Sequence, residues 1–74
     1  MNKARRKQLE SITAILTTAL DVLGELRDAE EDAYDNLPES IQESDRGYEM
    51  QEITDNLSDA YDSLEEAIDS LGDI

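Results

Sequence analysis

The chain has 74 residues with no cysteine and no histidine, and its 20 acidic residues against 6 basic ones give a formal net charge of −14. This length allows one small domain with a modest core. The composition excludes disulfides, ordinary zinc sites and histidine-based acid–base catalysis. The acidity disfavours nucleic acid and anionic membranes as partners and favours basic protein surfaces. We therefore expect a cytoplasmic binding protein that is not an enzyme and that holds no metal or cofactor.

The first residues carry most of the positive charge, because four of the six bases lie within residues 3–7. An uncharged band at residues 11–20 follows, and together they have the order of a secretory signal peptide. Glu10 and three threonines dilute the pattern, and no small-residue cleavage site follows it. The band is also too short to span a bilayer. We expect it to form part of a folded helix.

Apolar residues recur at alternating steps of three and four along residues 3–36, which indicates one long amphipathic helix. The predicted seam consists of Leu9, Ile12, Leu16, Ala19, Leu23, Leu26, Glu30, Ala33 and Leu37. Gly24 is expected on the outer side of this helix. Pro38 disfavours α geometry at Leu37, so the helix should end near residue 36.

The second half of the chain repeats the pattern. Residues 37–44 are predicted to form a linker, with Ser44 as the N-cap of a second helix over residues 45–72. Its seam consists of Met50, Ile53, Leu57, Ala60, Leu64, Ala67, Leu71 and Ile74. Two long amphipathic helices with a short break predict an all-α fold: an antiparallel helical hairpin forming one domain, residues 1–74. Folding back would bring the N-terminal bases near the acids of residues 65–73.

The apolar stripe of the first helix is wider than a two-helix seam requires. Pairing of two hairpins into a four-helix bundle would cover it, so we expect a homo-oligomer and prefer a dimer. The uncharged band is the candidate contact, although another protein could dock there instead. The residues predicted to mediate self-association are Ile12, Ile15, Leu16, Ala19, Leu20 and Leu23.

Acidic residues form regular rows on the outer sides of both helices, and we call these rows the acidic rails. The rail of the second helix consists of Glu52, Asp55, Asp59, Asp62, Glu66, Asp69 and Asp73. The rail of the first helix consists of Asp21, Glu25, Asp28, Asp32 and Asp35. Two charges per heptad correspond to one per about 5 Å of helix, against about 3.4 Å per phosphate in a DNA strand. The rails are either a solvated exterior or a mimic of nucleic acid that occupies a basic groove.

The segment of residues 33–47 reads AYDNLPESIQESDRG. It resembles a motif, close to YDNLPESLQ-S-RG, of short acidic proteins from bacterial genomes, prophages and mobile elements, which share a basic start like that of residues 2–7. The resemblance implies a phage or mobile-element setting and no catalytic residue. Arg46 is a candidate for fixing the turn by pairing with Glu39, Glu43 or Asp35.

These features leave three functions open. The first is a small interaction protein that binds and modulates a host protein, in its sharpest form an anti-defence inhibitor that presents the rails to a basic nucleic-acid-binding protein. The second is a structural module whose function is self-assembly. The third is a helical oligomer that binds a nucleotide through Arg5 and Arg6. None of them requires direct binding of nucleic acid or membrane.

Overall fold

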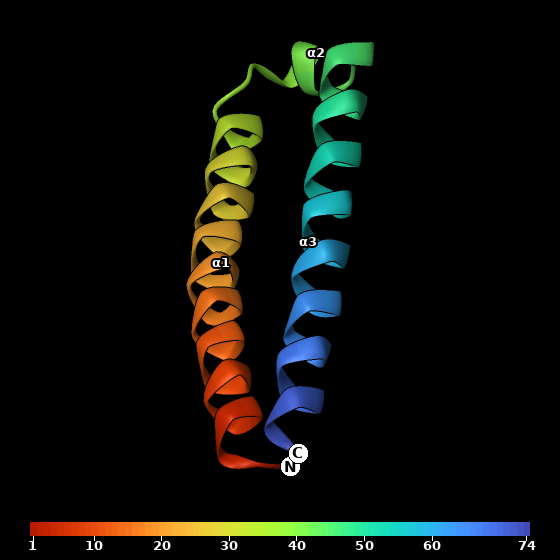
Figure 1. The fold of residues 1–74 in the computed structure, drawn as a ribbon. Helices are drawn as coiled ribbons and strands as arrows, with labels where there is room; N and C mark the ends of the chain where they lie inside the picture. The colour runs from red at the N-terminus through yellow and green to blue at the C-terminus, as the bar shows by residue number, and fades with distance from the viewer.

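A computed structural model describes all residues, 1–74. The chain forms helices α1 (Lys3–Asp35), α2 (Glu39–Gln42) and α3 (Asp45–Gly72). The two long helices run side by side in opposite directions, α2 lies at the tip, and both termini lie at the other end (Figure 1). The predicted all-α helical hairpin is thereby confirmed. Its dimensions are 58 × 14 × 13 Å.

The helix ends follow from local hydrogen bonding. Asn2 caps α1, because its side-chain oxygen accepts a hydrogen bond of 2.9 Å from the backbone N–H of Arg5. Ser44 stands immediately before α3, as predicted, but its hydroxyl donates to the carbonyl of Ile41 instead of accepting from the first turn of α3. Its side chain therefore closes α2 and does not cap α3.

The tip is held by a side-chain hydrogen bond and by one close backbone approach. The Gln42 amide donates to the backbone carbonyl of Tyr34 at 2.9 Å, which joins the linker to the end of α1. A Cβ added at Gly47 would stand 2.0 Å from the carbonyl oxygen of Gln42. The start of α3 thus crosses the end of α2 at a distance that only glycine permits.

The predicted role of Arg46 in the turn is wrong. Arg46 is exposed and forms no ion pair, and the only ion pair in the chain joins Arg27 to Asp28 at 3.2 Å. The glycine that follows Arg46 and the amide of Gln42 perform the function that we expected of the guanidinium.

The contact between the long helices uses only half of each predicted seam. The half-buried residues of α1 are Leu9, Thr13, Leu16, Leu20, Leu23, Arg27, Glu30 and Tyr34, and Leu37 of the linker is also half-buried. Those of α3, apart from Ser58 at its edge, are Met50, Thr54, Leu57, Tyr61, Leu64, Ile68 and Leu71. The other half of the predicted seam is exposed: Ile12, Ala19, Leu26, Ala33, Ile53, Ala60, Ala67 and Ile74.

A difference in side-chain size accounts for this correction. The predicted seam would have placed four alanines between the helices. The observed contact replaces them with neighbours that bury more apolar surface, namely Leu20, Tyr34, Tyr61 and Ile68. Each helix is therefore rotated about its axis, and the exposed half of its seam forms a second apolar stripe.

Gly24 is also placed differently from the prediction. It is buried against α3, and a Cβ added there would stand 3.1 Å from Cε2 of Tyr61. Near the tip, the Gln51 amide donates to the Tyr34 hydroxyl at 2.8 Å. In both pairs the residue numbers add to 85, so residue n of α1 lies level with residue 85 − n of α3.

One hairpin has no enclosed core. No hydrophobic side chain is buried, and the radius of gyration is 17.1 Å, against about 11 Å for a compact domain of this length. Neither long helix contains a stretch that is long and apolar enough to cross a membrane.

Candidate functional site

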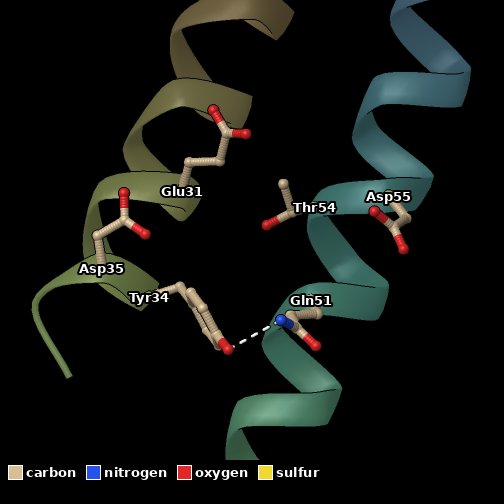
Figure 2. Close-up of a pocket in the computed structure, with 6 residues that line it drawn as sticks. All are labelled: Glu31, Tyr34, Asp35, Gln51, Thr54 and Asp55. Carbon is tan, nitrogen blue, oxygen red and sulfur yellow. Dashed lines mark hydrogen bonds between the residues drawn. The ribbon is translucent and has the colours of Figure 1, made fainter. Parts of the chain in front are cut away.

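An open depression between the long helices near the tip identifies one side of the hairpin. It has a volume of about 450 Å³. Its lining residues come equally from the two helices: Glu31, Tyr34 and Asp35 of α1, and Gln51, Thr54 and Asp55 of α3 (Figure 2). The hydrogen bond between Tyr34 and Gln51 crosses it. Three of the six side chains that line it are carboxylates.

Both acidic rails border this side. Asp35 belongs to one rail and Asp55 to the other, yet both line the same depression. Residues seven apart on a helix face nearly the same direction, so the rail aspartates spaced by seven from these two lie on the same side farther down the hairpin. They are Asp21, Asp28, Asp62 and Asp69. We call this the acidic side.

The acids are free to meet an external partner. Nineteen of the 20 acidic residues are exposed, including every member of both rails, and Glu30 is half-buried. The single ion pair, between Arg27 and Asp28, leaves the other carboxylates without a basic partner within 4.0 Å. The N-terminal bases share their end of the hairpin with the C-terminus, but they too form no ion pair.

The opposite side of the hairpin is almost free of charge, and we call it the uncharged side. On α1 it consists of Ile12, Ile15, Ala19, Val22, Leu26, Ala29 and Ala33, and on α3 of Ile53, Asn56, Ala60, Ser63, Ala67 and Ser70. All thirteen are exposed, and Ile15 is 68% exposed. In each helix the contact stripe separates this row from the acidic side. Because the helices are antiparallel, the two rows face the same way.

The structure divides the residues that the sequence assigned to self-association. Leu16, Leu20 and Leu23 are half-buried in the contact between α1 and α3, which limits their access to a partner. Ile12, Ile15 and Ala19 are exposed on the uncharged side. The α3 half of this side was missed, because its apolar members had been assigned to the intramolecular seam. The signal was present as six positions at steps of three and four that carry no charge.

The basic residues do not form one cluster. Lys3, Arg6 and Lys7 line a shallow depression together with Glu10, whereas Arg5 is not part of it. A nucleotide site built on both Arg5 and Arg6 is therefore not favoured. No group of three or more acidic side chains is arranged to hold a metal ion.

Comparisons with known proteins add no family to this description. The chain matches no protein-family model, and no curated protein sequence or solved structure is significantly similar to it.

Proposed function

We propose that this hairpin is a non-enzymatic binding protein whose acidic side binds a basic surface of another protein. The observation that carries the proposal is the placement of three aspartates from each rail on one side, all exposed and all but Asp28 without an ion pair. Unpaired charges of one sign speed the encounter with an oppositely charged surface and select against other partners.

The sharper form of the proposal is a partner whose basic groove normally holds nucleic acid. Packed helices lie about 8–10 Å apart, and on the acidic side each rail supplies one aspartate per heptad, or about 10.5 Å of helix. Two such rows approach the charge density of a nucleic-acid strand, which carries a phosphate every 3.4 Å or so. The linker motif shared with mobile-element proteins is in keeping with a host target, such as a nuclease of a defence system.

The test compares two variants with the same net charge. One neutralises four rail residues as Asp55→Asn, Asp59→Asn, Asp62→Asn and Glu66→Gln. The control neutralises four exposed acids at the tip, outside the rails: Glu39→Gln, Glu43→Gln, Asp45→Asn and Glu49→Gln. Each is immobilised and incubated with heparin-purified nucleic-acid-binding proteins of a bacterial host, and bound protein is quantified by mass spectrometry. The rail variant should lose the specific partner and the control should keep it. Equal loss in both would show that only net charge matters.

Self-assembly is the second candidate function. The observation in its favour is the exposure of large apolar residues on the uncharged side, among them Ile12, Ile15 and Val22, in a chain that buries no hydrophobic side chain of its own. Exposed contiguous apolar surface is typical of interaction sites. Light scattering tests this candidate: a mass of one chain at high micromolar concentration would remove it.

A further inference from the structure

We propose that a second copy of this chain covers the uncharged side, and that the two copies lie antiparallel, with the termini of one at the tip of the other. This inference rests on the proposed self-association and adds the surface and the orientation. It is independent of the acidic side, which remains open to solvent in such a dimer.

The surface area agrees with a missing partner of this size. One chain exposes 5545 Å². A compact protein of 8.3 kDa exposes about 4,600 Å². The excess, about 950 Å², is close to the ~800 Å² that each partner buries in a standard interface. The uncharged side is the long surface where burial would remove apolar groups from water without also removing rows of carboxylates.

Charge along the hairpin argues against a parallel pair. The half near the termini, residues 1–20 and 65–74, holds four bases and five acids and has a formal charge of −1. The half near the tip, residues 21–64, holds two bases and fifteen acids and has a charge of −13. A parallel dimer would place −13 beside −13. An antiparallel dimer places each strongly acidic half beside the nearly neutral half of its partner, which lowers the repulsion.

The ends of the uncharged side support the same orientation. Extended by one heptad step, its two rows reach Arg5 at the terminal end, and Arg46 and Glu49 at the tip. Glu49 lies level with residue 36, which directly follows α1, by the observed register. When two antiparallel hairpins overlap along their full length, residue 5 of one copy lies at the same height along the dimer as residue 36 of the other copy. Arg5 of each copy then lies level with Glu49 of the other, whereas a parallel pair would leave these two residues at opposite ends of the dimer.

Because the chain has no cysteine, single cysteines report the orientation directly. Ala19→Cys lies near the centre of the uncharged side, and Gln8→Cys and Ala33→Cys lie near its ends. In an antiparallel dimer the two Ala33→Cys thiols are about 37 Å apart, while a Gln8→Cys thiol is level with an Ala33→Cys thiol of the partner. Each variant is treated with a short bismaleimide, alone and in a mixture with one member labelled with ¹⁵N. Circular dichroism verifies that each variant keeps its helices.

The proposal predicts efficient cross-linking of Ala19→Cys alone and of the mixture of Gln8→Cys with Ala33→Cys. It predicts at least a tenfold lower yield for Ala33→Cys alone. Efficient cross-linking of Ala33→Cys alone would overturn the antiparallel orientation. No cross-link at any position, together with the mass of one chain, would overturn the dimer. Neither result bears on binding through the rails, which the rail variant and its control test separately.

Discussion

Gly24 of α1 lies against the ring of Tyr61 of α3, where an added Cβ would stand 3.1 Å from Cε2. The guanidinium of Arg27, one turn along α1, lies 4.6 Å from the centroid of the same ring. The ring therefore packs on the backbone of α1 and is covered by a cation–π contact. This arrangement fixes the register of the hairpin and directs the second apolar stripe of each helix outward.

Replacing Tyr61 should weaken the hairpin far more than replacing a tyrosine at the tip. We expect Tyr61→Ala to lower the free energy of unfolding by about 2 kcal/mol, below the range for fully buried aromatic residues because Tyr61 is half-buried. Tyr48 is 60% exposed, and Tyr48→Ala should change stability by less than about 0.5 kcal/mol. Urea unfolding followed by circular dichroism measures both. Similar losses in the two variants would contradict the packing described at Tyr61.

Gly47 is required by the crossing of α2 and α3. Gly47→Ala places a methyl group against the backbone of Gln42, which cannot move aside as a side chain could. We expect a loss of about 1–3 kcal/mol, as for other overpacked sites. Gly72→Ala is the matched control, since nothing lies within 4 Å of its added Cβ. A melting temperature for Gly47→Ala as high as that of the control would show that the tip is not close-packed.

Two polar residues near the tip, Gln42 and Arg46, are expected to differ in their contribution to stability. Gln42→Ala removes the hydrogen bond to the Tyr34 carbonyl and should cost about 1 kcal/mol. Arg46→Ala removes an exposed side chain without an ion pair, so the melting temperature should hardly change. Thermal unfolding of the two variants, measured in parallel, checks the assignment. A larger loss for Arg46→Ala would restore the role that the sequence suggested for it.

Salt should act in opposite directions on the two proposed interactions. Screening reduces the repulsion between two chains that each carry −14, so raising NaCl from about 50 to 500 mM should strengthen self-association. The same change should weaken binding of the acidic side to a basic partner. Sedimentation and the binding assay, each performed across this range of NaCl concentration, show whether salt strengthens or weakens each interaction. A dimer that dissociates as salt rises would mean that ion pairs and not apolar contacts hold it.

The sequence predicted the hairpin because heptad steps, Pro38 and the second run of apolar residues are local features. It did not predict the rotation of the helices. Ile12 and Thr13 differ by one position, and the seam pattern alone favoured the isoleucine, whereas the packing of Tyr61 on Gly24 turned Thr13 inward. That contact joins residues far apart in the chain, whereas periodicity describes only the spacing of residues within one helix. The periodicity therefore could not predict it. The rails were predicted as rows, but the placement of three aspartates of each rail on one side depends on the same rotation.

The most direct test of the account is the molar mass in solution, measured by sedimentation equilibrium for three chains. The wild-type chain should have twice its 8.3 kDa mass at micromolar concentration. Ile15→Glu with Leu26→Glu places two charges on the uncharged side and should reduce the mass to that of one chain. Ser11→Glu with Thr18→Glu adds the same charge on the outer side of α1 and should leave the dimer intact. A wild-type chain that stays at 8.3 kDa, or two double variants that behave alike, would contradict the account.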